Sequence, residues 1–468
     1  MSALDNILEN LPEVAHPSQK KLSFKEKLKW TCIILVLFFV LSLIPLFGLG
    51  QNALQRFELI SVILGASLGS IMSLGIGPIV TASIVLQLLN GSGIVKFDTS
   101  TKDGKKRFQG LQKILTLFFI IFEACIYVFM GGLAPPEAIS GVSIVGTSLF
   151  FQLELLLIFQ LCLGGILVML MDEVISKWGF GSGVSLFIAA NVSQSLFIRL
   201  LSPLPSPTNP SIATGAIPAL FQSLSGGDPQ TALLMLAGIL STALVFVIAV
   251  YAQAMKVEIP LSFGRVRGHG IRWPLHFIYT SNMPVILISA LLANIQVFAR
   301  ILENWGHPIL GTFAGNTPSS GLIAWITPPD VVGSIIRGAL SFDLIARGLV
   351  FIVFLIAGSV LFSWLWVQTS GMDAKSQAKQ IMASGLQIPG FRKDERVLER
   401  ILDRYIGPLT IMGAVTVGFL AGIADISGSL TNGTSLLLTV MIIYRLYEDV
   451  ARQHLMDMNP MMRKFMGG

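Results

Sequence analysis

The sequence predicts an all-α integral membrane protein with ten transmembrane helices, and three observations lead to this fold class. First, 53% of the 468 residues are hydrophobic and only 12% are charged, with a mean hydropathy of +0.74, whereas a soluble domain carries about 25% charged residues. Second, ten segments are apolar over windows of about 19 residues, the length that crosses hydrocarbon. Third, Lys and Arg are unevenly distributed between these segments. Most of the chain is therefore expected to lie within a membrane.

The ten expected spans fall into two groups of five. They lie near residues 31–47, 76–90, 114–133, 149–171, 180–201, 232–255, 277–298, 344–367, 405–424 and 430–450. Because each group holds an odd number of spans, the second group enters the membrane from the opposite side. We therefore expect an inverted repeat of two five-helix halves around a central pore. The expected divisions are an amphipathic N-terminal segment at 1–30, a first half at 31–201, an external linker at 202–231, a second half at 232–450 and a C-terminal tail at 451–468.

The basic residues predict the orientation. If the N-terminus is cytoplasmic, all but five of the 32 Lys and Arg residues lie in cytoplasmic segments, as the positive-inside rule requires. The exceptions are Arg56, Arg199, Arg300, Arg337 and Arg347. We therefore expect a multi-pass protein with both termini in the cytoplasm. Residues 22–30 are interpreted as a basic helix on the inner membrane surface, or as a charged leader that only enforces topology, and not as a cleavable signal peptide.

The second expected span is interrupted. A Gly- and Ser-rich stretch at 64–75 leads into a short apolar block at 77–89 that begins with Gly-Pro. Gly and Pro break helices, and the block is shorter than the roughly 20 residues needed to cross hydrocarbon. Broken helices occur at membrane depth only where protein or a water-filled cavity covers them. This segment is therefore predicted to line or close a conduit.

The sequence carries no catalytic or metal-binding motif. It has no Walker loop, zinc motif or nucleophile–base pair. Cys32, Cys125 and Cys162 all fall inside expected spans without metal-ligand spacing, and they are interpreted as packing residues. We therefore expect no catalytic residue, no metal and no cofactor, in a protein that is not an enzyme.

Charged residues inside the spans are few, which limits what the protein could transport. Glu123 lies between apolar neighbours in the third span, where a carboxylate facing lipid would cost about 2.5–3.5 kcal/mol. It is expected to face a helix seam or a wet cavity, or to be protonated, with an incidental buried carboxylate as the alternative. Asp425 is expected at the membrane interface. The scarcity of such groups argues against a proton- or sodium-coupled carrier and against a selective ion channel. It favours a conduit lined by aliphatic side chains, which excludes ions by dewetting.

Two cytoplasmic loops, at 257–273 and 372–404, are long and basic. The first alternates apolar and polar residues like a strand or hairpin. Arg clusters with Gly suit phosphate backbones such as those of RNA. These loops are therefore interpreted as a docking surface, with ordinary topology signals as the alternative.

Several runs of residues form longer motifs. GIGPIVT lies at 75–81, WGFGSGVSLFIAAN at 178–191 and YTSNMPVIL at 279–287, with IPLFG at 44–48 and YRLYE at 444–448. Together they resemble the SecY family, the large subunit of the protein-conducting channel, in its archaeal and eukaryotic branch. The resemblance covers all ten spans in order. It implies a passive channel that is driven by an external partner.

This resemblance implies roles for particular residues. It implies a plug helix at 52–67, with Asn52, Phe57 and Leu64. It implies an apolar pore ring at Ile76, Val80, Val184, Ile188, Ile286 and Leu438, with Leu437 as the alternative in the last span. It implies a lateral gate between spans 2 and 3 and spans 7 and 8, with the polar cluster Thr81, Glu123 and Asn294. It implies ribosome docking at Arg265, Arg267, Arg392 and Lys393.

The implied function is that of the central pore-forming subunit of a protein translocase in the cell membrane. Such a subunit conducts unfolded secretory polypeptides across the membrane and releases transmembrane segments sideways into lipid. The implied partners are gamma-type (SecE) and beta-type small subunits, a ribosome with its nascent chain, signal sequences and membrane lipid, and a homodimer of the complex is left open. Without the resemblance, two other classes stay open: a secondary transporter with Glu123 as its coupling site, and a scaffold for assembling membrane proteins.

Overall fold

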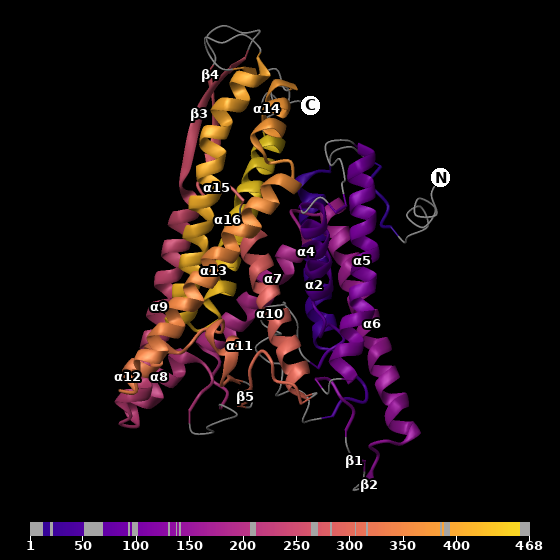
Figure 1. Cartoon of the computed structure of the whole chain (residues 1–468), viewed down its shortest axis with the longest axis vertical. Coiled ribbons are helices and arrows are strands. Elements are labelled where there is room, and N and C mark those ends of the chain that lie inside the picture. Colours follow the sequence, from indigo (N-terminus) through magenta and orange to yellow (C-terminus); the bar gives the residue numbers. More distant parts are fainter. Residues whose placement is uncertain are drawn as a thin grey trace.

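The structure, a computed structural model of the chain, is shown in Figure 1. It describes residues 13–18, 22–50, 69–91, 94–95, 102–129, 132–136, 138–139, 142–205, 212–263, 270–280, 283–304, 306–314, 317–383, 386–387 and 394–458. Within these ranges the chain is a bundle of long helices, with a small sheet that extends from one end (Figure 1).

Each of the ten expected spans contains a helix. These helices are α2 (Phe24–Ser42), α4 (Gly77–Gly91), α5 (Lys102–Phe129), α6 (Ser148–Trp178), α7 (Gly183–Leu201), α9 (Pro229–Ala254), α10 (Met283–Asn304), α13 (Phe342–Thr369), α15 (Glu395–Ile426) and α16 (Gly433–Met458). Seven of the described helices, α5, α6, α7, α9, α10, α13 and α15, are long and apolar enough to cross a membrane. Of the other three, α4 is short, as its Gly-Pro start predicts, while α2 and α16 carry charged residues at one end. The predicted fold class is confirmed.

The helices pack as two halves that contact each other through two sets of helices. In the first half α2 and α5 pack on α6, and α4 packs on α5; in the second half α13 packs on α15, and α16 packs on α9. Between the halves, α4 contacts α10 and α13, and α7 contacts α16. The linker holds a further helix, α8 (Ala216–Ser225), which contacts both α7 and α9. One short helix therefore joins the two halves.

The first span begins differently from the expectation. Helix α2 runs without interruption from Phe24, so the basic segment and the apolar segment share one helix instead of forming a separate surface helix. Ser23 caps it, because the backbone N–H of Glu26 donates a 3.4 Å hydrogen bond to the Ser23 hydroxyl. Extending an existing helix adds one hydrogen bond per residue, whereas starting a second helix is costly. For this reason the basic and the apolar residues form one continuous helix.

The two basic loops share one small sheet. Strands β3 (Lys256–Phe263) and β4 (Gly270–His276) pair in antiparallel fashion, which confirms the hairpin that the alternating pattern predicts. Strand β7 (Leu386–Gln387), from the second loop, adds to the free edge of β3 at Ser262 and Phe263. The structure therefore brings together two loops that lie more than a hundred residues apart in the chain.

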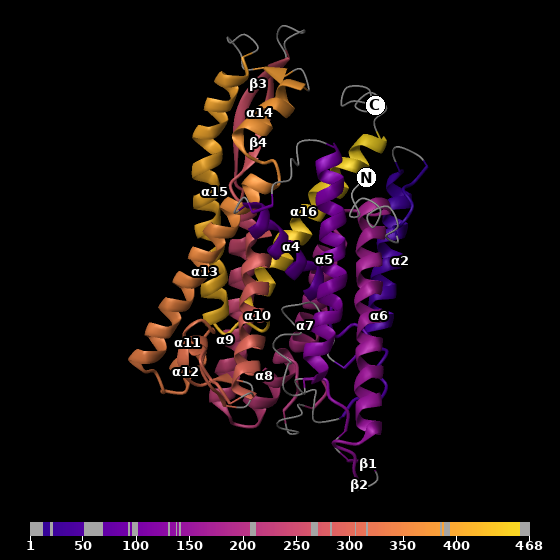
Figure 2. The same ribbon diagram turned by 45° about the vertical axis from the view of Figure 1, so that its right-hand side comes forward.

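A helix and a tyrosine fasten this sheet to the bundle. Helix α14 (Ala374–Ala383) packs against α15 and β7, and the sheet, α14 and one end of α15 lie together at the same end of the molecule (Figure 2). Tyr279 donates a 2.7 Å hydrogen bond to the carbonyl of Met372, which links the first loop to the second.

The opposite end of the molecule consists of loops and short elements. The segment after α10 contains the hairpin β5 (Phe313–Ala314) and β6 (Thr317–Pro318) and the short helices α11 (Gly321–Trp325) and α12 (Val331–Ile336). The side chain of Ile323 in α11 is fully buried, so this segment packs back onto the helices. A second small hairpin, β1 (Ala138–Ile139) and β2 (Val142–Ser143), lies at the same end (Figure 1).

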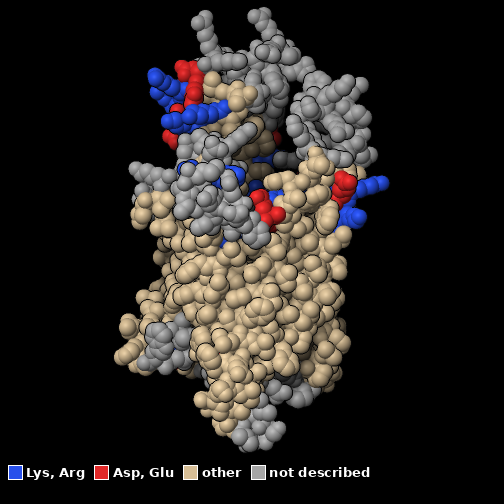
Figure 3. Space-filling model, turned by 90° about the vertical axis from the view of Figure 1, so that its right-hand side faces the viewer, with Lys and Arg blue, Asp and Glu red and all other residues tan. Residues whose placement is uncertain are grey.

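Charged side chains are distributed unevenly over the surface. On the face shown in Figure 3, the described Lys, Arg, Asp and Glu side chains gather toward the end that carries the sheet, above a broad uncharged band. Many large apolar side chains of the helices are exposed, among them Phe159, Leu240 and Val353. An exposed apolar surface of this kind is stable against lipid and unstable against water. The band is therefore the membrane-embedded part of the bundle.

Helices α13 and α15 pack with their backbones close together. Gly418 and Gly422 of α15 face Ile356 and Ile352 of α13, and a Cβ on Gly418 would lie 2.8 Å from the Ile356 Cα atom. Small residues four apart are the usual means by which two membrane helices approach closely. These glycines therefore set the distance between the two helices.

We predict that Gly418→Ala lowers the free energy of unfolding by about 1–3 kcal/mol, because the new methyl group meets backbone that cannot move aside easily. Thermal unfolding in detergent measures the effect. Gly407→Ala is the matched control on the same helix, since its Cβ would have no neighbour within 4 Å. Equal melting temperatures for the two variants would contradict this account of the packing.

Candidate functional site

The structure gathers the six residues of the expected ring where the two halves contact each other. Ile76 directly precedes α4 and Val80 lies in its first turn; Val184 and Ile188 lie in α7, Ile286 in α10 and Leu438 in α16. All of them except Val184 are at most 6% exposed and belong to one buried cluster, and Val184 packs against that cluster. Four helices from both halves therefore contribute aliphatic side chains to one apolar region, which we call the constriction.

The constriction residues occupy matched positions in the two halves. Val80 and Ile286 each lie two residues after a proline that is second in its helix. Ile188 and Leu438 each lie five residues after the glycine that begins its helix. This relates α4 to α10 and α7 to α16, as an inverted repeat of five spans requires. The sequence signal for the second match is Gly-x-Ser-Leu at 183–186 and again at 433–436, and it favours Leu438 over Leu437 as the ring residue.

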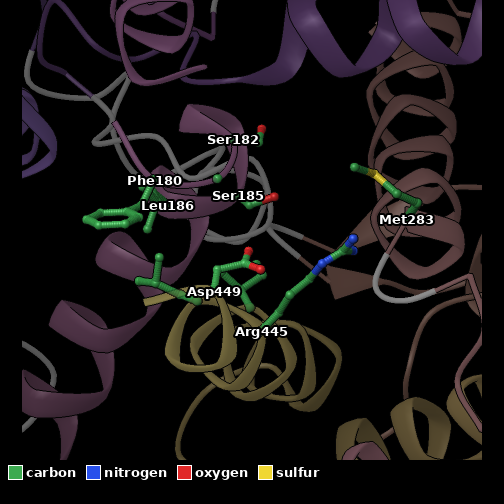
Figure 4. A pocket seen from close by; sticks show the side chains of 10 residues that line it. Phe180, Ser182, Ser185, Leu186, Met283, Arg445 and Asp449 are labelled. Atoms are coloured by element: carbon green, nitrogen blue, oxygen red, sulfur yellow. The ribbon is translucent and has the colours of Figure 1, made fainter. Parts of the chain in front are cut away.

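A cavity of about 250 Å³ adjoins the constriction (Figure 4). Its walls come from the start of α7, the start of α10 and the middle of α16, and include Ser185, Met283 and Ile442. Arg445 and Asp449, four residues apart on α16, also line it and extend toward its interior (Figure 4). Sequence analysis did not single out these two charged residues as site residues. A buried apolar region next to a partly charged cavity is the arrangement expected at the neck of a pore.

The three residues of the expected gate cluster lie together where α4, α5 and α10 meet. The hydroxyl of Thr81 donates to Glu123 Oε1 at 3.0 Å, and the side-chain amide of Asn294 donates to the Thr81 hydroxyl at 3.4 Å. The Thr81 hydroxyl is also 2.9 Å from the carbonyl of Gly77 in its own helix, so its single proton has two acceptors. Glu123 thus faces a helix seam and not lipid. We call this cluster the polar seam.

The polar seam connects the two halves weakly. Hydrogen bonds between membrane helices average about 0.6 kcal/mol and reach about 1.7 kcal/mol. The 3.4 Å contact from Asn294 is the part that crosses from α10 to α4. Separating α4 and α5 from α10 therefore costs little hydrogen-bond energy.

Two carboxylates have roles that the sequence analysis missed. Asp425, expected at the membrane interface, is partly buried and accepts hydrogen bonds from the backbone N–H and the hydroxyl of Thr434. Asp172 of α6 accepts a 2.9 Å hydrogen bond from the backbone N–H of Val184. Asp425 and Thr434 are nine residues apart, and Asp172 and Val184 are twelve residues apart. Both separations are beyond the range of the usual local capping patterns.

Seven expected site residues lie outside the described residues. These are the plug residues Asn52, Phe57 and Leu64 and the docking residues Arg265, Arg267, Arg392 and Lys393. Near the docking residues, the structure describes the end of β3 at Phe263 and its partner strand β7. The strands that directly precede the two basic segments in the chain, β3 and β7, are therefore hydrogen-bonded neighbours.

A two-half helical membrane protein with a buried aliphatic constriction and a weak polar seam belongs to the class of transmembrane conduits. The SecY family matches residues 70–447, and the chain belongs to this family. The protein translocase subunit SecY of Methanothermobacter thermautotrophicus is 45% identical over 98% of this chain and 97% of that protein.

Solved structures agree with this assignment. A protein conducting channel with 40% sequence identity superposes with a TM-score of 0.81, covering 97% of this chain and 98% of that one. Sec61 in the canine ribosome–channel complex from the endoplasmic reticulum, at 39% identity, gives a TM-score of 0.79 and covers 97% of each chain.

We predict that Thr81 and Glu123 are energetically coupled. In a double-mutant cycle with Thr81→Val and Glu123→Leu, the coupling free energy is expected near 0.6 kcal/mol, the average for a hydrogen bond between membrane helices. Thermal or denaturant unfolding in detergent provides the four stabilities. Thr116→Val in α5 is the control partner, because the hydrogen bond described for its hydroxyl stays within its own helix, at the carbonyl of Gln112. A coupling no larger than that of the control pair would mean that the Thr81–Glu123 bond contributes nothing to the seam.

Proposed function

We propose that this chain is the central pore-forming subunit of a protein translocase. It conducts unfolded secretory polypeptides across the membrane and releases transmembrane segments sideways into lipid. The observation that carries the proposal is the constriction, in which aliphatic side chains from matched helices of both halves are buried together. Such a neck excludes ions by dewetting and still admits an extended polypeptide, because it offers no fixed charge or hydrogen-bond geometry that selects one solute.

At rest the constriction blocks ions and water, together with a plug at 52–67. The plug is inferred from the family. When a signal sequence or a membrane span enters between α4 and α5 on one side and α10 and α13 on the other, the polar seam parts. The halves then hinge about the linker that contains α8. The hydrogen bond between Glu123 and Thr81 gives the carboxylate a partner at this seam, so a coupling ion is not needed to explain it.

The sheet formed by β3, β4 and β7 is the proposed base of the ribosome-docking surface. It carries the two segments that contain Arg265, Arg267, Arg392 and Lys393. Arginine matches the geometry of phosphate groups, which suits ribosomal RNA, and the related canine Sec61 is found in a ribosome–channel complex. In this arrangement the sheet-bearing end and both termini are cytoplasmic, as the distribution of basic residues predicts.

The chain works as a passive channel in the cell membrane. Translocation is driven from outside the chain, by ribosomal synthesis or another partner. Its further proposed partners are gamma-type (SecE) and beta-type small subunits, signal sequences and membrane lipid. Exposed apolar helix surfaces, such as those carrying Leu240 and Val353, are available for single-span subunits or lipid.

We predict that polar substitution of the constriction opens the resting channel to ions. Val184→Asn combined with Ile188→Asn is expected to raise the resting ion conductance roughly tenfold, because hydrated side chains prevent dewetting. Planar-bilayer recording of the purified complex measures it. Leu161→Asn is the control, since Leu161 is as buried as Ile188 but belongs to a different cluster. An unchanged conductance in the double variant would reject the assignment of Val184 and Ile188 to the constriction.

Cross-linking tests the function itself. A single cysteine replaces Ile188 in a background without Cys32, Cys125 and Cys162, the three free cysteines of the chain. Ribosome-bound secretory chains of stepped length, each with one cysteine, are then tested for disulfide formation with position 188. Cross-links that depend on chain length are expected, because the polypeptide passes the constriction in extended form at about 3.3 Å per residue. No cross-link at any length, with ribosomes bound and chains engaged, would argue against a protein-conducting channel and favour the secondary transporter or the scaffold.

A further inference from the structure

Two helices of the constriction, α7 and α16, have a backbone N–H in the first turn that donates a hydrogen bond to a carboxylate of the preceding helix. The Val184 N–H, in the first turn of α7, donates to Asp172 Oδ1 at 2.9 Å. The Thr434 N–H, in the first turn of α16, donates to Asp425 Oδ1 at 3.0 Å, and the Thr434 hydroxyl donates to Asp425 Oδ2. Ser182, at the local cap position of α7, makes no side-chain capping bond. The free N–H groups at a helix start need an acceptor, and here a neighbouring helix supplies it.

A glycine at each helix start permits this approach. A Cβ on Gly183 would lie 2.6 Å from the Asp172 Cα atom, and a Cβ on Gly433 would lie 2.2 Å from the Ala424 carbonyl carbon. Real Cβ atoms essentially never come this close to another atom, so the backbone would have to shift to admit a side chain at either position. The first residue of each helix is therefore in direct contact with the preceding helix near its carboxylate.

The bonded residue lies one helical turn before a constriction residue in both halves. Val184 precedes Ile188 by four residues, and Thr434 precedes Leu438 by four residues. In an α-helix, residues four apart lie on the same face. Holding the N–H of 184 or 434 in place therefore holds the rotation and the depth at which the aliphatic side chain enters the constriction.

Each carboxylate also lines a cavity. Asp172 lines a cavity of about 730 Å³ together with Lys113, Glu173 and Lys177, and Asp425 lines one of about 360 Å³ in the other half. Lys113 and Lys177 both pair with Glu173, while the structure's described ion pairs include neither Asp172 nor Asp425. The hydrogen bonds described for these two carboxylates are those to the helix starts. A carboxylate is stabilised there by the N–H groups and by the positive end of the helix dipole.

We propose that Asp172 and Asp425 are positioning residues for the pore. Each fixes the start of one constriction helix, α7 or α16, against the helix before it and so sets the position of Ile188 or Leu438. The two carboxylates act alike in the two halves but not at equivalent positions, because Asp172 lies eleven residues and Asp425 eight residues before the glycine that begins the next helix. This inference rests on the proposed function, because it assigns the two carboxylates a role in closing the channel.

The test compares resting ion conductance with thermal stability in the assembled complex isolated from membranes. Asp172→Ala and Asp425→Ala are each expected to raise the conductance roughly threefold or more, since a displaced aliphatic side chain leaves a gap that wets. Asp172→Asn and Asp425→Asn are expected to stay near the wild-type conductance, because Asn keeps an acceptor oxygen and its amino group can donate to the Thr434 hydroxyl.

Asp228→Ala is the matched control. Asp228 caps α9 by accepting from the Thr231 N–H at 3.2 Å and from the Thr231 hydroxyl at 2.6 Å, but α9 carries no residue of the constriction. It is expected to lower the melting temperature by an amount similar to the other Ala variants without changing the conductance. A conductance increase as large in Asp228→Ala, or none in Asp172→Ala and Asp425→Ala, would overturn the proposal.

Glycine variants keep the test valid if an Asp→Ala variant fails to fold. Gly183→Ala and Gly433→Ala push the helix start away while both carboxylates remain, so they are expected to raise the conductance as well. Gly407→Ala, whose Cβ would meet no atom within 4 Å, is expected to have no effect. Wild-type conductance in both glycine variants would also overturn the proposal. If position 188 cross-links to translocating chains while these variants do not leak, only the positioning role fails and the proposed function stands.

Discussion

The structure depends on one constraint: in hydrocarbon, every backbone N–H and C=O must find its partner within the protein. The chain breaks its helical pattern inside the bundle just before α4, and this break survives because a neighbouring segment supplies the partners. The N–H of Leu46 donates to the carbonyl of Gly69 at 2.8 Å, and the N–H of Ile71 donates to the carbonyl of Ile44 at 3.0 Å. Gly164 of α6 makes room for the break, since a Cβ there would lie 1.8 Å from the Ile71 carbonyl oxygen. The short helix α4 can therefore begin inside the protein.

The start of α4 contributes residues both to the constriction and to the polar seam. Val80 lies in the constriction and Thr81, the next residue, lies in the polar seam. Neighbouring residues on an α-helix point about 100° apart, because one turn takes 3.6 residues. A movement of α4 away from α10 therefore changes the constriction and the seam together. Under the proposed function, this joins passage across the membrane to release into the membrane in one mechanical step.

Much of this architecture was predictable because membrane insertion depends on composition over long windows. Hydropathy located all ten helices, and alternation located the β3–β4 hairpin. The cost of a carboxylate in lipid predicted that Glu123 faces a helix seam or a wet cavity, and its hydrogen bond with Thr81 places it at a seam. The partners of Asp172 and Asp425 were not predictable in this way. Each bonds to the start of the next helix, and only the packing of the two helices shows which N–H groups come within reach.

The sequence by itself determined that the chain lies in a membrane, where its spans fall and that the halves are inverted, because apolar length and an odd span count depend on local residues alone. The motifs also led to Thr81, Glu123 and Asn294. Only the tertiary structure decided that these three bond to one another across three helices, that two distant basic loops share one sheet, and that a carboxylate of the preceding helix bonds to the start of α7 and of α16. These features depend on distances between segments far apart in the chain, and such distances are set when the helices pack.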